Sequence, residues 1–188
     1  MKERILKTAA EEMNERGVKF TVDAVAARLG ISKKTLYQYF ESKDHLIASI
    51  VDAAIVDMAN QKAEIMNSNK DFVSKLAAIV TVEPKIFGKV HDWVLEDIKR
   101  HRPEDWERIT CFRRERTQAM AKILEEGIAG GHIRRINTAV AAQMLCSAVG
   151  EFLEYGFLAE NNISFTDALQ ALTDIFLYGV LTEKPALE

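Results

Sequence analysis

Apolar residues recur every three or four positions along nearly the whole chain, and no stretch alternates apolar with polar residues as a half-buried β-strand does. This periodicity predicts an all-α fold. The segments with this periodicity are bounded by capping residues and by helix breakers. They cover residues 2–16, 22–29, 33–40, 43–66, 70–81, 84–100, 104–128, 138–160 and 165–182.

The second and third of these segments are short and meet at a glycine. Thr21 is a suitable N-cap for the first of the two and Ser32 for the second, while Gly30 ends the helix between them. Two short helices joined by such a turn form a helix-turn-helix, a motif that places its second helix against DNA. The sequence therefore predicts a helix-turn-helix over residues 22–40.

The distribution of charge favours the same part of the chain. Over all 188 residues, 25 Lys and Arg stand against 28 Asp and Glu, and this net charge of −3 argues against a general polyanion-binding protein. The first 50 residues, however, carry nine Lys and Arg against seven Asp and Glu. From Arg28 to Lys43, four cations face a single acid, Glu41. The alternative is a solvated helix face that happens to carry lysines, so the placement of these residues on the helix has to decide.

The segment over residues 33–40 has two different faces. Leu36 and Phe40 are four residues apart and are expected to face the core. The residues left near the outer face are basic, aromatic or amide-bearing: Lys33, Lys34, Tyr37 and Gln38. Such a short exposed helix fits the major groove of DNA, where Lys donates to guanine and a Tyr ring contacts a thymine methyl group.

Groups suited to phosphate oxygens stand close by in the sequence. Thr21, Thr35 and Tyr39 supply hydroxyls. Lys43 is at the start of the segment over residues 43–66, where free backbone N–H groups form the positive end of a helix. We therefore expect both base contacts and phosphate contacts from this part of the chain.

Residues 21–46, with the sequence TVDAVAARLGISKKTLYQYFESKDHL, resemble the N-terminal signature of the TetR family of bacterial transcriptional regulators. The resemblance is continuous over about residues 2–50. Its most specific part is the spacing of LYxxF, SK and L within residues 36–46. Residues 124–134 are similar to the family's usual break before the eighth helix.

The resemblance implies about nine helices, with a helix-turn-helix DNA-binding domain at residues 1–45 and a ligand-binding and dimerisation domain at residues 46–186. It implies base contacts from Lys33, Lys34 and Tyr37. It also implies phosphate contacts from four residues: Thr21, Thr35, Tyr39 and Lys43. The implied function is that of a regulator, most often a repressor, that binds a pseudo-palindromic operator as a homodimer and is released by a small-molecule ligand in its C-terminal domain.

Two residues depart from the family pattern. Met13 stands where an aromatic residue is frequent, and Lys34 stands where Gly or another small residue is frequent. The long side chain at position 34 leaves open whether Lys34 reads a base or only reaches a phosphate.

The last two segments hold more apolar residues than one buried face requires. One face is enough for the core of a single chain, so the excess on residues 138–160 and 165–182 predicts a second burial partner. A two-fold, four-helix interface between two chains accounts for the excess. The residues expected in it are Phe152, Leu172, Ile175 and Phe176. The alternative is that both helices are simply central in their own bundle.

Candidate ligand-pocket residues lie on or beside apolar stripes of the later segments. Arg113, Arg116 and Glu151 are charged groups suited to orient a polar part of a ligand, and the alternative for each is a rim charge or an internal ion pair. The candidate walls, for which core packing is the alternative, are Trp93, Phe112, Met120 and Tyr155. Cys111 and Cys146 are interpreted as small apolar residues, with redox sensing as the alternative.

Other functional classes fit the chain less well. It contains no GxSxG, HExxH, P-loop or GxGxxG motif, and its two Cys and four His lack metal-ligand spacing, so the rival hypothesis of a helical-bundle enzyme is weak and no cofactor or metal is expected. No run of about 18 uncharged apolar residues and no secretory segment is found, which predicts a cytoplasmic protein without a membrane partner. The expected partners are double-stranded operator DNA, a second copy of the chain and an unknown small-molecule effector. A second rival hypothesis is a dimeric ligand-binding protein with a vestigial DNA-binding head.

Overall fold

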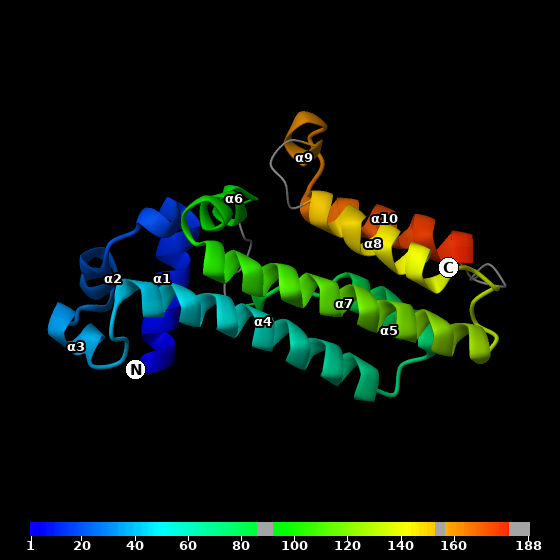
Figure 1. Ribbon diagram of the computed structural model, residues 1–188, viewed down its shortest axis with the longest axis horizontal. Coiled ribbons are helices and arrows are strands. Elements are labelled where there is room, and N and C mark those ends of the chain that lie inside the picture. Colours follow the sequence, from blue (N-terminus) through cyan, green and yellow to red (C-terminus); the bar gives the residue numbers. More distant parts are fainter. Residues whose placement is uncertain (86–91, 153–156, 181–188) are drawn as a thin grey trace. The chain divides into compact units, whose positions relative to one another are not determined.

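The computed structural model of the protein describes residues 1–85, 92–152 and 157–180, and all the longer elements within them are helices, joined by turns and loops (Figure 1). Within them the all-α prediction is confirmed, and so is the number of about nine helices, because nine α-helices have five or more residues and α9 is a single turn. The elements are α1 (Lys2–Arg16), η1 (Gly17–Lys19), α2 (Val22–Leu29), α3 (Lys33–Tyr37), α4 (Lys43–Asn67), α5 (Phe72–Val80), α6 (Asp92–His101), α7 (Pro103–Ala129), α8 (Thr138–Phe152), α9 (Phe157–Glu160) and α10 (Phe165–Val180).

Helix α3 is shorter than predicted and ends at Tyr37. Beyond it the backbone tightens, with the Tyr39 N–H donating to the Leu36 carbonyl at 3.0 Å, three residues back instead of four. This turn still brings Phe40 into the core, where its side chain is fully buried.

The prediction of a single helix over residues 138–160 is wrong, because the structure has two separate helices, α8 and α9, in this range. The rings of Phe152, which ends α8, and Phe157, which begins α9, stack with their centroids 5.8 Å apart. Side chains five residues apart on a straight α-helix point about 140° away from each other, so they do not stack. Residues 153–156 lie outside the described part of the chain.

The helix predicted over residues 84–100 is described only from Asp92 to His101, as α6. Pro84, predicted at its first position, is not in a helix, and residues 86–91 lie outside the described part. Pro103, in contrast, is the first residue of α7, where its missing N–H costs no hydrogen bond.

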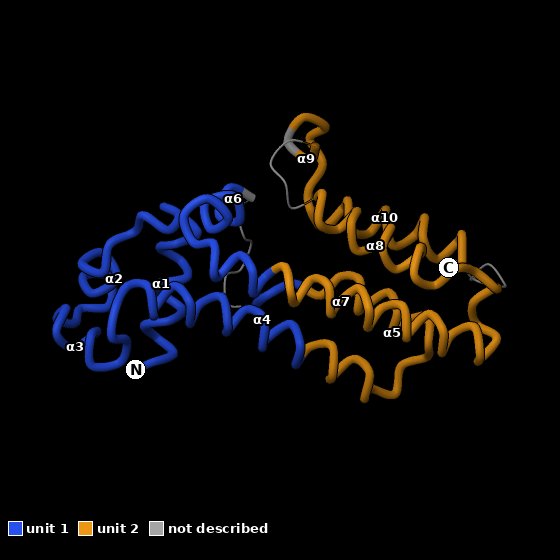
Figure 2. Tube along the Cα trace, in the orientation of Figure 1, with its two compact units in different colours: residues 1–60, 83–109 blue, residues 61–82, 110–188 orange. Residues whose placement is uncertain are grey.

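The chain divides into two compact units (Figure 2). Unit 1 comprises residues 1–60 and 83–109, and unit 2 comprises residues 61–82 and 110–188. This division differs from the functional boundary proposed at residue 45, because α6 and the first parts of α4 and α7 pack with the N-terminal helices. The assignment of DNA binding to residues 1–45 remains a prediction.

The core of unit 1 joins α1 to α2, α3, α4 and α6. Its fully buried large side chains include Met13, Phe20 and Phe40, each of which contributes about 1.5–3 kcal/mol by leaving water. Met13, which replaces a frequent aromatic residue of the family, is therefore a core residue. Val94 and Ile98 of α6 belong to the same cluster.

Gly17 allows α6 to approach the end of α1. Its φ of +66° and ψ of −163° are accessible essentially only to glycine, and a Cβ atom here would overlap the carboxylate of Asp97. That carboxylate accepts the N–H of Val18 at 2.7 Å. The indole of Trp93 also lies against this glycine.

Unit 2 has its own core, formed by α5, α7, α8 and α10. Leu76, Leu124 and Leu145 are among its most buried members. After α7 the chain turns at the break predicted for residues 124–134, and Arg134 closes the end of α10. Its main-chain N–H donates to the Val180 carbonyl at 2.9 Å, and its Nε donates to the Gly179 carbonyl at 2.7 Å.

Candidate nucleic-acid interface and ligand cleft

Local hydrogen bonds fix the geometry of the helix-turn-helix. Thr21 Oγ1 accepts the N–H of Ala24 at 3.1 Å and so caps α2. Gly30 ends α2 in the left-handed conformation, with φ +66° and ψ 32°, and the Ile31 N–H returns to the Ala26 carbonyl at 3.0 Å. This is a Schellman turn, which satisfies the last carbonyls of α2 and sets the direction of the chain into α3.

Helix α3 begins with a second cap. Ser32 Oγ accepts the N–H of Thr35 at 3.0 Å and lies 2.8 Å from the hydroxyl of Thr35. The hydroxyl of Thr21 therefore bonds the backbone and that of Thr35 bonds the capping hydroxyl of Ser32, although each retains capacity for a further hydrogen bond.

The two faces of the α3 region lie as the periodicity predicts. Leu36 and Phe40 are fully buried. Tyr37 and Tyr39 are each 40% exposed. The charged and amide side chains of the outer face are exposed as well: Lys33, Lys34 and Gln38. Hydrogen-bonding and aromatic groups thus gather on a helix whose other side is anchored in the core.

Two cations of the basic segment are engaged within unit 1. Lys33 Nζ donates to Asp23 Oδ2 at 2.9 Å, and this hydrogen bond raises the pKa of Lys33. Arg28 Nη1 lies 3.0 Å from Glu15 Oε1 and 3.1 Å from Glu12 Oε1, and these bonds raise the pKa of Arg28. Arg28 therefore neutralises the acidic face of α1 and joins α1 to α2.

The other two cations behave differently. Lys43 lies over the ring of Phe20, with its Nζ 5.1 Å from the ring centroid, and its partial burial lowers its pKa. Lys34 is exposed, and within the described residues its ammonium has neither an ion pair nor a hydrogen bond. The four cations are equivalent in a count of charges along the sequence, but the fold gives them different surroundings.

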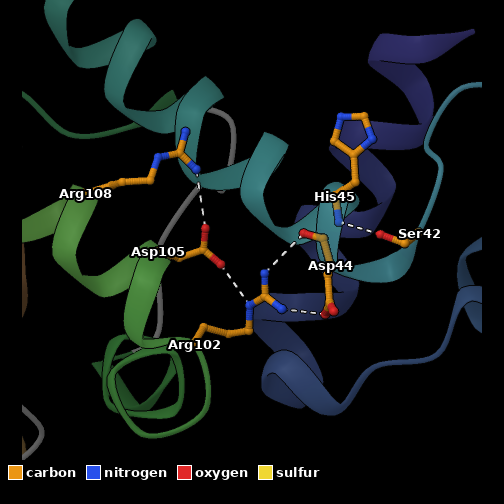
Figure 3. Close-up of polar contacts among 6 residues, drawn as sticks. All are labelled: Ser42, Asp44, His45, Arg102, Asp105 and Arg108. Atoms are coloured by element: carbon orange, nitrogen blue, oxygen red, sulfur yellow. Dashed lines mark hydrogen bonds and ion pairs between the residues drawn. The ribbon is translucent and has the colours of Figure 1, made fainter.

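A polar cluster that the sequence did not reveal ties the start of α4 to the start of α7 (Figure 3). Arg102 Nε donates to Asp105 Oδ2 at 2.8 Å, and its Nη1 pairs with the Asp44 carboxylate. Arg108 reaches both the other Asp105 oxygen, at 3.3 Å, and Asp52. The buried carboxylate of Asp105 is thereby neutralised by two guanidinium groups. The signal in the sequence was limited to two acidic residues, Glu104 and Asp105, in the first turn after Pro103.

In unit 2, a cleft of about 510 Å³ lies between α7 and α8. It brings together Arg113 and Arg116, two of the predicted ligand residues. The lining residues that sequence reasoning missed are Arg114, Thr117, Gln118, Gln143, Cys146, Ser147, Val149 and Gly150. They were missed because no periodicity indicates which face of α8 meets α7.

The other predicted ligand residues lie elsewhere. Trp93 is in unit 1, against Gly17, and Met120 is buried in the core of unit 2. Phe112 is half-buried and Glu151 is exposed, and neither lines the cleft. Tyr155 is outside the described residues.

A second hollow of unit 2 is an apolar groove of about 430 Å³ between α8 and α10. Three of the predicted interface residues line it: Leu172, Ile175 and Phe176. Large apolar side chains stand open to solvent here, with Ile175 73% and Met144 68% exposed. Phe152, the fourth predicted residue, stacks on Phe157 and does not line this groove.

Across the described ranges, no three His, Cys, Asp or Glu side chains gather as metal ligands. None of the described helices combines the length and the apolar character that a membrane span requires.

Residues 5–50 match the model of the bacterial regulatory proteins of the tetR family. The chain is 24% identical over 187 residues to the uncharacterized HTH-type transcriptional regulator YvaF of Bacillus subtilis (strain 168), covering 99% of this chain and 98% of YvaF. It is 29% identical over 136 residues to the HTH-type transcriptional repressor KstR2 of Rhodococcus jostii (strain RHA1), covering 69% of this chain and 66% of KstR2. The fold is similar to that of a TetR transcriptional regulator from Chloroflexus aurantiacus J-10-FL, with a TM-score of 0.76, 20% identity and 96% of each chain covered.

Proposed function

We propose that this chain is a transcriptional regulator of the TetR family and that it acts as a repressor that binds a pseudo-palindromic operator as a homodimer. The observation that carries the proposal is the outer face of α3, where Lys33, Lys34 and Tyr37 are exposed on a helix anchored by Leu36. In a dimer, two such helices enter successive major grooves about 34–36 Å apart. Repression is supported by the likeness to KstR2, which is itself named a repressor.

The contacts with DNA divide into two kinds. Tyr37 and Lys34 project from α3 and are the proposed base readers. Lys43, Thr21 and Tyr39 flank that helix and are the proposed phosphate contacts, which position the protein without reading the sequence. Lys33 joins the base readers once it leaves Asp23. Thr35 is the remaining proposed phosphate contact.

The proposed dimer forms through α8 and α10. Their shared groove exposes Val140, Met144 and Ile175, and such apolar side chains are stabilised when a second copy covers them. A two-fold axis through this face would produce a four-helix interface, in which the same residues of both chains meet.

Release from DNA is proposed to follow the binding of a small molecule in unit 2. Helices α4 and α7 each contribute residues to both units, so they are physical routes by which a ligand in one unit biases the other. A ligand acts in this way only if it binds the DNA-competent and the released states with different affinity. Because the proposed partner is genomic DNA, the proposed location is the cytoplasm.

The test is a fluorescence titration with labelled duplexes from the region upstream of the chain's own gene. We expect tight binding to one short palindromic segment, weaker binding to a shuffled duplex of equal composition, and affinity that falls steeply between about 50 and 200 mM salt. The variant Lys34→Ala/Tyr37→Ala, which changes only exposed residues, should lose the preference for the palindrome. Binding to no duplex at any salt concentration would instead favour a ligand-binding protein with a vestigial head.

A further inference from the structure

We propose that the cleft between α7 and α8 binds an organic anion, with a carboxylate or phosphate group held by the guanidinium groups of Arg113, Arg114 and Arg116. The inference rests on the proposed function in one respect, that unit 2 receives a small-molecule effector. It adds the chemical class of that effector and the side chains that recognise it.

The charge of the cleft is one-sided. Three arginines within four residues of α7 line it, and none of its lining residues, all of which belong to the described part of the chain, is Asp or Glu. Arg113 and Arg116 are three residues apart on α7, and like charges at this spacing on a helix repel one another, so a bound anion would relieve the repulsion. Guanidinium groups present paired donors that match the two oxygens of a carboxylate or phosphate.

Arg116 is the central residue of this argument. Its side chain is half-buried, and the acceptor that it contacts is a main-chain carbonyl, that of Val80, 3.3 Å from Nη2. Burial lowers the pKa of Arg116, which means that its charge is less well solvated than in water. A carbonyl is a dipole and does not neutralise a cation, so an anionic ligand would supply the missing charge.

The opposite wall of the cleft is polar but neutral. Gln143 Nε2 donates to Ser147 Oγ at 2.8 Å, so these two α8 side chains already form a hydrogen-bonded pair facing the arginines. Cys146, Val149 and Gly150 supply a less polar surface beside them. The cleft volume of about 510 Å³ is in the usual range for small-molecule sites. Together these walls suit an anionic head attached to an apolar body.

The test compares two dyes that differ by one anionic group. 8-Anilinonaphthalene-1-sulfonate carries a sulfonate whose oxygens resemble those of phosphate, and N-phenyl-1-naphthylamine is the same skeleton without it. Fluorescence titration of the full chain should show that the anionic dye binds at least about tenfold more tightly. Displacement of that dye by 1-naphthoate or by 1-naphthyl phosphate then tells whether the cleft prefers a carboxylate or a phosphate.

Substitutions in the cleft locate the binding. Arg116→Gln should weaken the anionic dye about tenfold and leave the neutral dye unchanged, and Arg116→Lys should recover part of the loss. Gln143→Glu, which places a negative charge on the opposite wall, should weaken the anionic dye without removing the Arg116 bond to Val80. Lys122→Gln removes one exposed charge from α7 outside the cleft and serves as the matched control.

Three results would overturn the inference: no binding of the anionic dye, equal binding of both dyes, or equal affinity of the wild type, Arg116→Gln and Gln143→Glu for the anionic dye. Circular dichroism and thermal unfolding of each variant exclude loss of the fold as the cause. Operator binding measured on the same samples separates this inference from the proposed function. If the wild type binds the operator but not the anionic dye, only the inference is contradicted. If the wild type binds the dye through Arg116 but binds no operator, only the proposed function is contradicted.

Discussion

The ammonium group of Lys33 lies 2.9 Å from the carboxylate of Asp23, so the first residue of α3 is tied to the first turn of α2. Both side chains are at least half exposed, so solvent screens their attraction. Lys33 can therefore leave Asp23 for another acceptor at little cost in free energy. In the proposed complex, the acceptor atoms of a guanine base would compete with Asp23 for the same cation. Asp23 thus sets how readily Lys33 is released to DNA.

Asp23→Asn should therefore raise the affinity for the operator by about twofold to fivefold and change the affinity for random duplex much less. The reason is that Lys33 no longer has a competing carboxylate. Fluorescence anisotropy with each duplex measures both effects. Glu41→Gln makes the same change in net charge on an exposed residue of the same unit. If the two variants raise affinity equally, the pair with Lys33 has no specific role.

Tyr37→Ala should weaken binding to the operator by about 1–3 kcal/mol and leave binding to random duplex nearly unchanged. Tyr37 is 40% exposed on the outer face of α3, where its ring can meet a base edge without disturbing the buried Leu36. Tyr37→Phe keeps the ring and should retain most of the affinity if the contact is with a thymine methyl group. An equal loss on both duplexes would reassign Tyr37 to the phosphate contacts.

Lys43→Ala should weaken operator and random duplex alike and reduce the salt slope by roughly one. Because burial over Phe20 lowers the pKa of Lys43, its charge disappears at a lower pH than that of an ordinary lysine. As the pH rises through that pKa, the wild type should lose the Lys43 contribution to DNA affinity. Lys43→Arg, which remains charged, should keep it. Parallel pH profiles of the wild type and Lys43→Arg would argue against a phosphate contact.

Ile175→Asp should convert the proposed dimer into monomers and abolish tight operator binding. Ile175 is 73% exposed in the groove between α8 and α10, and in a dimer the substitution would bury an unpaired carboxylate on each side of the two-fold axis. Light scattering coupled to size exclusion measures the mass directly. Thr166→Asp adds the same charge to an exposed residue of α10 that does not line the groove, and it should leave the dimer intact.

Gly17→Ala should lower the free energy of unfolding of unit 1 by about 2–4 kcal/mol. The new methyl group would strain a backbone conformation reserved for glycine and displace the Asp97 carboxylate from the Val18 N–H. Gly30→Ala is the matched control, because its φ is also +66° but a Cβ atom there meets nothing within 4 Å. The control should cost about 1 kcal/mol. Chemical denaturation followed by circular dichroism measures the free energy of unfolding of both variants. Equal losses would mean that the close packing of α6 against the end of α1 does not require glycine at position 17.

The helix-turn-helix was predictable because its causes are local. Thr21, Gly30 and Ser32 act within three to five residues of themselves, so their capping roles can be read from the order of residues alone. The burial of Leu36 and Phe40 followed from their spacing in the same way. The division of residues 138–160 was not predicted, although Gly156 directly precedes Phe157, because the apolar pattern continues on both sides of this glycine.

The sequence by itself determined that this protein is helical, that α3 presents a basic and aromatic face, and that α10 has more apolar surface than one chain needs. Only the tertiary structure determined which charged side chains form ion pairs. Arg28 pairs with Glu12 across 16 residues and Arg102 with Asp44 across 58, and these distances in sequence carry no periodic signal. Capping and amphipathicity act over one or two helical turns, whereas ion pairs and clefts depend on how separate helices pack. For that reason the exposed basic and aromatic face of α3 could be predicted from the sequence, but the partner of Lys33 and the arginine-lined cleft could not.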